Sequence, residues 1–187
     1  MSDPRSKQID YSHHIVSSAD QLFWAVEQIP TGRHYVRPLP AFGEWSVARI
    51  LYHQLWLEER LILPCLQIWM GQPEPDYSSF VDDQEERDWR SDDLTMSELL
   101  DRLQNSRRRI IEVVGRLSDQ DWTTERETIY GSVEPSWLVG LLVQSTLEQS
   151  SLLMQMSLYW DLYLIDLKNA RLRARAEASD DQSEDVT

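Results

Sequence analysis

The sequence has a single cysteine, Cys65, and few basic residues relative to acidic ones. One thiol cannot form a disulfide within the chain, so no disulfide framework supports the fold. There are 18 Lys and Arg against 32 Asp and Glu, which gives a formal net charge of −14. Proteins bind the phosphates of nucleic acids and anionic lipid surfaces through clusters of positively charged residues. The charge balance therefore argues against nucleic acid and against a membrane surface as partners.

Long hydrophobic runs and the common catalytic signatures are missing as well. No segment approaches the roughly 18 uninterrupted apolar residues of a membrane span, and the first ten residues, MSDPRSKQID, contain no hydrophobic signal region. The sequence has no Gly-rich phosphate loop, no G-x-S-x-G elbow and no H-E-x-x-H motif. These absences predict a cytoplasmic protein without a familiar nucleotide, hydrolase or metalloprotease site.

Apolar residues recur instead at helical spacing in four long segments, approximately 10–29, 44–70, 95–117 and 136–176. Pro64 predicts a kink one turn earlier in the second segment, since proline lacks the backbone N–H of a helix interior. The third segment begins with Thr95-Met96-Ser97-Glu98, which matches a capping box. The fourth begins with Pro135 and is long for one helix, so we expect a bend or break near residues 157–165 and an additional C-terminal helix.

The connecting segments are polar. Residues 82–89 are acidic and predict a solvated loop or short turn, and residues 123–134 predict a short extended excursion with a turn at Gly131. Residues 177–187 are acidic and predict a disordered tail. The predicted fold is all-α: one domain over residues 1–176, a four-helix up-down bundle with a crossover connection and an additional C-terminal helix.

Four short motifs occur in an order typical of one family. Trp45-Ser46-Val47 is followed by His53, the third helix ends in LSDQDW, ETIYGSV precedes SWLVGLL, and TLEQ stands where that family often has LEH. Over residues 12–165 the sequence resembles the DinB-like superfamily, which includes bacillithiol-transferase-type proteins.

The resemblance implies a divalent metal held by three histidines, of which His53 matches the first. Aligning TLEQ with the family motif puts Gln149 and Leu153 at the other two positions. Leucine has no donor atom, and an amide oxygen is a poor substitute for imidazole with transition metals. The resemblance therefore implies a degenerate metal site and no metal cofactor. The alternative is Zn or Ni held by His53 with substitute ligands.

A helical wheel for the second helix puts His53 at the margin, in a row with Trp56. The inner face of the same helix is predicted to hold five residues: Val47, Ile50, Gln54, Leu57 and Leu61. Glu58 also falls on the inner side, whereas Glu148 falls near the edge of the apolar face of the fourth helix. Together with His53, these two carboxylates could form a mixed metal or catalytic site.

Gln149 lies near the middle of the apolar face of the fourth helix. A buried amide without a partner is destabilising by about 1–3 kcal/mol. We therefore expect a hydrogen bond to His53, directly or through water, or else a subunit interface at this point. The predicted pocket accordingly comprises six residues: His53, Gln149, Leu153, Trp56, Glu58 and Glu148.

Other residues receive plainer interpretations. Cys65 is expected to be a buried apolar group, Arg107-Arg108-Arg109 a solvated face, and His34 an exposed loop residue. The predicted function is that of a small-molecule-binding or interaction protein, as a homodimer, because the resemblance and the eight tryptophans both favour association. The competing prediction is a metal- or thiol-dependent transferase in which His53 still acts.

Overall fold

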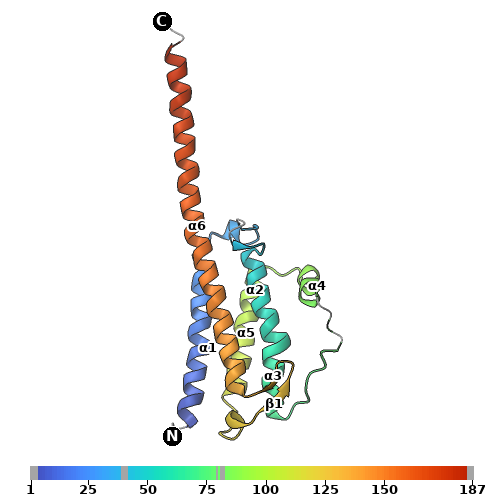
Figure 1. Ribbon diagram of the computed structural model, residues 1–187. Helices are drawn as coiled ribbons and strands as arrows, with labels where there is room; N and C mark the ends of the chain where they lie inside the picture. Colours follow the sequence, from blue (N-terminus) through green and yellow to red (C-terminus); the bar gives the residue numbers. More distant parts are fainter. Residues whose placement is uncertain (1–3, 39–41, 79, 81–82, 185–187) are drawn as a thin grey trace.

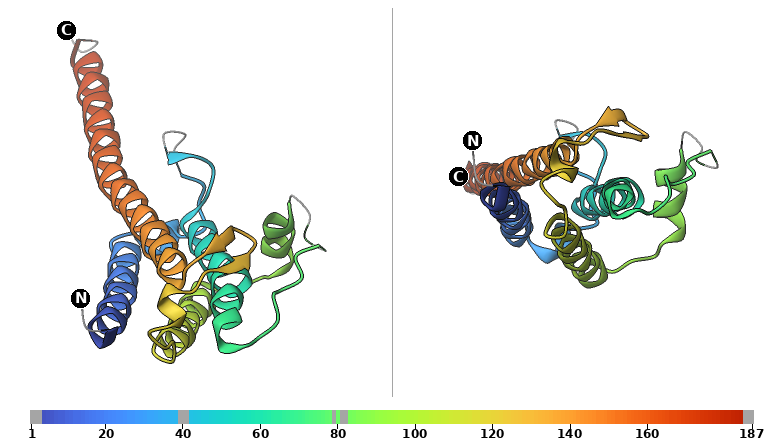
Figure 2. Two further views of the ribbon diagram at one scale, coloured as in Figure 1. Left: turned by 60° about the horizontal axis from the view of Figure 1, so that its bottom comes forward. Right: turned by 90° about the horizontal axis from the view of Figure 1, so that it is seen from below.

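The computed structural model describes residues 4–38, 42–78, 80 and 83–184. Four long helical segments form the body of the protein (Figure 1), and the view from below shows them arranged around a common centre (Figure 2). They begin with α1 (Pro4–Glu27) and α2 (Val47–Trp56) and continue with α5 (Met96–Val114) and α6 (Pro135–Glu184). α1 and α6 rise side by side, and α2 and α5 descend beside them. The prediction of an all-α bundle with a crossover is confirmed.

The helix that starts with α2 changes its winding before it ends. After Trp56 comes a π-helical turn, Leu57–Ile62, in which Leu63 N–H bonds to Glu58 O, five residues back. α3 (Leu63–Gln67) and a 3-10 turn (Ile68–Met70) complete the segment. Pro64 has no N–H to offer to the carbonyl of residue 60. The irregularity expected one turn before this proline is therefore present, as a π turn.

The crossover from the lower end of α3 to the top of α5 contains a helix that the sequence interpretation missed. The prediction of a loop or turn over residues 82–89 is wrong, because α4 spans Gln84–Ser91; residue 82 lies outside the described residues. Two acidic residues occupy its first turn and Arg90 its last. This distribution favours a helix because carboxylates stabilise the positive end of the helix dipole and cations the negative end.

The connection from α5 to α6 follows the prediction. α5 begins with the capping box of Thr95 and Glu98, in which both reciprocal hydrogen bonds are present. β1 (Arg126–Thr128) and β2 (Gly131–Val133) then form a small antiparallel hairpin beside the lower end of α3 (Figure 1), and Gly131 has a φ of 86°. That positive φ suits glycine, which has no Cβ to clash.

α6 is one continuous helix of 50 residues, so the break expected near residues 157–165 is absent. It curves as it leaves the bundle (Figure 2) and runs far beyond the end of α1. Residues 177–184, part of the segment predicted as a disordered tail, belong to this helix, and residues 185–187 lie outside the described part of the chain. No helix among the described residues is long and apolar enough to cross a membrane.

The core has an upper and a lower apolar cluster. Leu22, Ile50 and Leu153 represent the upper cluster, and Ile62, Ile110 and Leu142 the lower. Eleven polar or charged side chains are also buried among the described residues. Two of these overturn predictions: Arg107 is only 4% exposed, and His34 is buried with Nε2 donating to Ile29 O over 2.9 Å.

Candidate functional site

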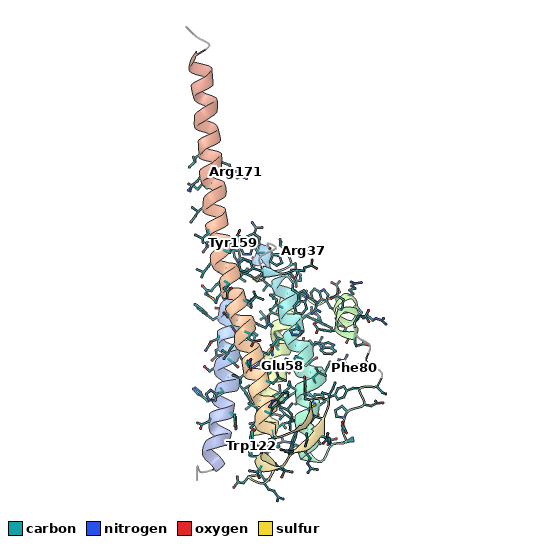
Figure 3. All side chains as sticks on the ribbon, in the orientation of Figure 1. Arg37, Glu58, Phe80, Trp122, Tyr159 and Arg171 are labelled. Atoms are coloured by element: carbon teal, nitrogen blue, oxygen red, sulfur yellow. The ribbon has the colours of Figure 1, made fainter. Side chains whose placement is uncertain are left out.

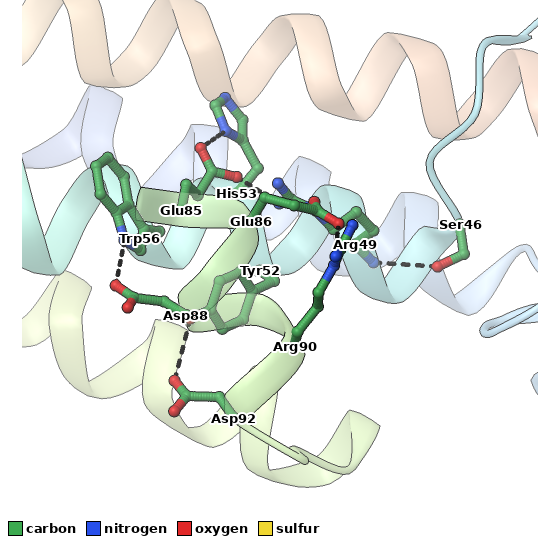
Figure 4. A network of polar contacts seen from close by, with 10 residues as sticks. All are labelled: Ser46, Arg49, Tyr52, His53, Trp56, Glu85, Glu86, Asp88, Arg90 and Asp92. Carbon is green, nitrogen blue, oxygen red and sulfur yellow. Dashed lines mark hydrogen bonds and ion pairs between the residues drawn. The ribbon is translucent and has the colours of Figure 1, made fainter. Parts of the chain in front are cut away.

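His53 lies at the outer margin of α2 and faces α4. Its Nδ1 donates a hydrogen bond to Glu85 Oε2 over 2.9 Å, and the Trp45 indole lies 5.0 Å from the imidazole between ring centroids. Figure 4 shows this pair, with the carboxylate reaching across from α4. The His53 side chain is 28% exposed. The imidazole is thus oriented by a carboxylate through one nitrogen and is partly open to solvent.

Arg49, one turn before His53, is the basic centre of the same network. Its guanidinium pairs with Glu85, and its Nε donates to Glu86 Oε2 over 3.4 Å. The indole of Trp45 covers the guanidinium at 4.4 Å, an arrangement that suits a cation–π contact. Burial by itself would raise the pKa of Glu85, but the hydrogen bonds from His53 and Arg49 outweigh burial and lower it. Glu85 is therefore an ionised carboxylate shared by two partners.

Further contacts hold α4 against α2. Trp56 Nε1 donates to Asp88 Oδ2 over 3.0 Å, and Tyr52 OH donates to Asp92 Oδ2 over 3.1 Å (Figure 4). Burial raises the pKa of Tyr52, and the neighbouring Asp92 carboxylate raises it further, so the phenol remains a donor. These bonds fix the position of the helix that supplies Glu85.

A surface cavity of about 480 Å³ opens beside this network, above Arg49. Its lining combines aromatic rings with two pairs of opposite charge. The lining residues are Tyr35, Arg37, Glu44, Trp45, Ser46, Arg49, Glu86 and Trp89. Arg37 pairs with Glu44 in an exposed ion pair at the cavity, as Arg49 pairs with Glu86 deeper down. The cavity therefore offers aromatic surface together with positive and negative groups.

A second polar cluster lies between the helices, in the centre of the bundle. Glu58, whose position Figure 3 marks, is fully buried and accepts hydrogen bonds from Arg107 Nε over 2.6 Å and Gln54 Nε2 over 3.1 Å. Gln54 in turn accepts from Ser145 Oγ of α6 over 3.1 Å, and Arg107 also donates to Thr146 Oγ1. The cluster thus joins α2, its π turn, α5 and α6.

Opposing influences act on the carboxyl group of Glu58, and burial dominates, so its pKa is raised. Burial raises the pKa of Glu58, while the positive charge of Arg107 and the hydrogen bond from Gln54 act in the opposite direction. Oε2 has no hydrogen-bond partner among the described residues. The cluster is enclosed by core side chains, so it reads as a structural ion pair rather than as a site reached by substrate.

The predicted pocket residues do not form one group. Leu153 is fully buried in the upper apolar cluster, Gln149 is partly buried, and Glu148 is exposed and accepts from Gln144 over 2.9 Å. No hydrogen bond between described residues joins Gln149 to His53. Glu58 is bound by Arg107, and His53 by Glu85, so these two side chains serve separate clusters.

The sequence interpretation missed Arg49, Glu85 and Arg107. Glu85 belongs to the acidic segment treated as solvated loop, so nothing assigned it a partner. The one available signal was helical: acidic residues at the start and a basic residue at the end of 84–91 favour a helix. Within the described part of the chain, no group of three or more His, Cys, Asp or Glu side chains could hold a metal ion.

A family model described as the DinB superfamily matches residues 14–144. This match covers most of the chain, and the protein belongs to the DinB superfamily, as the sequence motifs predicted. No curated protein sequence matches the chain. The matched segment includes His53 and ends inside α6, before Gln149 and Leu153.

Proposed function

We propose that this DinB-superfamily protein does not use the three-histidine metal chemistry that the resemblance implies, and that it binds a small molecule in the cavity above Arg49. The observation that carries the proposal is the cavity itself, with Trp45 forming both part of its wall and the contact to His53. The binding site is thus adjacent to the histidine that matches the family motif.

The donor atoms around His53 favour the loss of the metal site. Nδ1 of His53 is bound to Glu85, which itself is shared with Arg49. Leu153, at a position where the resemblance calls for histidine, is a fully buried leucine without a donor atom. A site for a transition metal needs several imidazole, thiolate or carboxylate donors that converge on one point. A single imidazole with one carboxylate does not meet that requirement.

The chemistry of the lining indicates the class of ligand. Trp45, Trp89 and Tyr35 offer flat aromatic surfaces, on which a planar molecule gains both buried area and stacking. The charged groups occur as ion pairs, Arg37 with Glu44 and Arg49 with Glu86. A ligand with a strong net charge would be repelled by the group of like charge in each ion pair. The cavity therefore suits a planar molecule that is neutral or zwitterionic.

One observation favours a second function. A carboxylate that accepts from one imidazole nitrogen makes the other a better base or metal ligand, and His53 with Glu85 has this arrangement. A thiol-dependent transferase that uses His53 as its base is therefore the rival proposal.

Metal analysis and calorimetric titration discriminate between the two. Untagged protein is expected to contain Zn and Ni far below one equivalent, whereas near-stoichiometric metal that disappears in His53→Ala would support the transferase. Nicotinamide, a planar neutral amide, and L-phenylalanine, a zwitterion, serve as binding probes. We expect saturable binding of at least one, weakened tenfold or more by Trp45→Ala and unchanged by Trp137→Ala, whose indole is exposed and outside the cavity. Absence of saturable binding by both probes would overturn this ligand class.

A further inference from the structure

The upper part of α6, most of which projects beyond the bundle, exposes large aliphatic side chains to solvent. Leu158 and Leu162 are each 62% exposed, Ile165 is 55% exposed and Leu172 is 53% exposed. Figure 1 shows that no other described element lies beside α6 over its upper half, and Figure 3 marks Arg171 on this projecting part. Isolated exposed leucines are normal at protein surfaces, but a continuous apolar face marks an interaction site.

These side chains share one face of the helix. At about 100° per residue, Leu158, Leu162, Ile165, Asn169 and Leu172 fall within a stripe about 80° wide. The same stripe continues down α6 into the bundle. There it includes Gly140, Val143, Gln144, Leu147, Ser151 and Met154, which together widen it to about 100°. One face of α6 is therefore available for pairing from residue 140 to residue 172; we call it the α6 stripe.

The lower half of the α6 stripe borders a hollow. A surface cavity of about 470 Å³ lies between α1 and α6, and its lining is almost entirely apolar. Tyr11 and His14 line it from α1, and α6 contributes residues between Val139 and Ser151. The lower half of the stripe is thus concave and contains small residues, whereas the upper half is a bare helix with large ones.

We propose that a second copy of this chain covers the stripe, with the two α6 helices antiparallel. The projecting part of each copy then fills the cavity between α1 and α6 of the other. The two halves of the stripe have matching lengths, residues 140–154 in the lower half and residues 158–172 in the upper half. Two identical surfaces can therefore pair about one two-fold axis, which is the closed arrangement of most homodimers.

Side-chain sizes select one register for this pairing. With Met154 of one copy opposite Leu158 of the second, Leu147 lies opposite Ile165 of the second copy. In the same register small residues meet large ones, since Gly140 lies opposite Leu172 and Ser151 lies one position from the point opposite Leu162. Packing small against large residues allows two helices to interdigitate without voids.

The register also pairs the polar residues of the stripe. Gln144 lies one position, about 1.5 Å along the axis, from the point opposite Asn169 of the second copy, so the two amides can donate to and accept from each other. A polar pair inside an apolar helix seam costs some stability and fixes the register.

Charge favours the antiparallel orientation over the parallel one. Residues 168–175, KNARLRAR, carry four positive charges in a chain whose net charge is −14. In the antiparallel register Lys168 lies opposite Gln144 of the second copy, one helical turn from Glu148, which borders the cavity. A parallel pair would place Lys168 and Arg171 of one chain beside the same two residues of the other chain. Like charges that face each other are destabilising.

The mass of the protein in solution tests this pairing, which does not depend on any ligand. The wild-type protein is expected to have twice the 22.0 kDa mass of the chain in light scattering after size exclusion. Ile165→Asp places a charge on the α6 stripe and is expected to give a monomer. Met70→Asp alters a residue that is 38% exposed and outside the stripe, and it is expected to remain dimeric. A wild-type monomer at about 100 μM, or an Ile165→Asp dimer, would overturn the proposal.

Gly140→Leu tests the cavity without endangering the fold. A Cβ at residue 140 would meet no other atom within 4 Å in the single chain, and leucine has a higher helix propensity than glycine. The variant monomer is therefore expected to be at least as resistant to heat as the wild-type chain, while the new side chain fills the space for Leu172 of the second copy. Loss of the dimer with unchanged helix content supports the pairing; a stable dimer contradicts it.

Cysteine cross-linking tests the orientation. A mixture of Leu147→Cys and Ile165→Cys chains is expected to form an intermolecular disulfide on mild oxidation, because these positions face each other in the antiparallel register. Each variant alone places its two thiols roughly 27 Å apart along the axis, from 18 residues at 1.5 Å each, and is expected to remain uncross-linked. Efficient cross-linking of each variant alone would instead show a parallel pair.

Discussion

Arg107 Nε donates to Glu58 Oε1 over 2.6 Å in the centre of the bundle, and neither side chain is more than 5% exposed. The two residues are 49 positions apart in the sequence. Bringing two charges out of water is costly, and their attraction offsets that cost only with good geometry and further hydrogen bonds. Here the further bonds come from Gln54, Ser18 and Thr146.

Removing the Arg107 side chain is therefore expected to destabilise the fold strongly. Arg107→Met leaves the Glu58 carboxylate buried without a countercharge and is expected to reduce the free energy of unfolding by about 3–5 kcal/mol. Urea denaturation followed by circular dichroism measures the change. The double variant Glu58→Met/Arg107→Met removes both charges and is expected to recover most of the loss. Arg108→Met, at an exposed neighbouring position, is the control and is expected to change stability by less than about 0.5 kcal/mol. If Arg107→Met and Arg108→Met are equally mild, the ion pair does not hold the bundle together.

Glu85 is expected to stabilise the fold in a pH-dependent manner. Its pKa in the folded protein lies below the ordinary 4.5, because the bonds from His53 and Arg49 outweigh its burial. A carboxyl group with a lowered folded pKa contributes stability above its unfolded pKa and loses it as the pH falls through the folded value. Glu85→Gln should thus reduce the free energy of unfolding by about 1.5 kcal/mol at pH 7, which is the lower end of the range for a hydrogen bond to a charged group. The difference from wild type should shrink steadily below pH 4.5. Chemical denaturation of both proteins from pH 7 to pH 3 measures it, and a constant difference would show that the carboxylate charge is not involved.

The capping box at the start of α5 gives a local prediction. Thr95 Oγ1 accepts from Glu98 N–H over 3.3 Å, and Glu98 Oε2 accepts from Thr95 N–H over 2.8 Å. Thr95→Ala removes one of these partners and is expected to destabilise the protein by about 1 kcal/mol. Ser97→Ala, in the same helical turn and exposed, should be close to neutral. Comparable losses for both substitutions would rule out a special role for the cap.

Cys65 is expected to be unreactive in the folded protein. Burial raises the pKa of the thiol, and its sulfur lies 3.4 Å from Tyr77 OH. The thiolate is the reacting species, so a disulfide reagent should modify Cys65 only as fast as the protein unfolds. Asn105→Cys adds an exposed thiol on α5 for comparison and should react at once. Rapid labelling of wild-type protein under native conditions would show that this part of the core opens readily.

Much of the fold could be predicted because its signals are local. Helical spacing, the capping box and Pro135 each depend on neighbouring residues, and the structure confirms the elements that they indicate. The prediction for the inner face of the second helix was less accurate. Gln54 and Glu58 are buried as expected, but Leu57 and Leu61 are only partly buried and Ile62 takes the core position. A wheel drawn at a constant angle cannot anticipate a π turn.

The site depends on contacts between distant segments, and there the sequence was a weaker guide. His53 bonds to Glu85, which is 32 positions away on α4. The acidic composition of α4 had led to the prediction of a loop. Arg107 lies in a run of three arginines that looked uniform, yet only this one points between the helices. Neighbouring positions on a helix face different directions, so the role of each is decided by tertiary packing rather than by composition.

The π turn at Leu57–Ile62 also affects how this chain is compared with others. A π turn holds about one residue more than an α turn, so α2 and α3 differ in phase by roughly 100°. Aligning the chain with a relative whose second helix is uninterrupted therefore requires a one-residue gap inside this turn. Without that gap, each residue from Leu63 to Met70 would be equated with a neighbour of its true counterpart, and any role transferred there would fall on the wrong side of the helix.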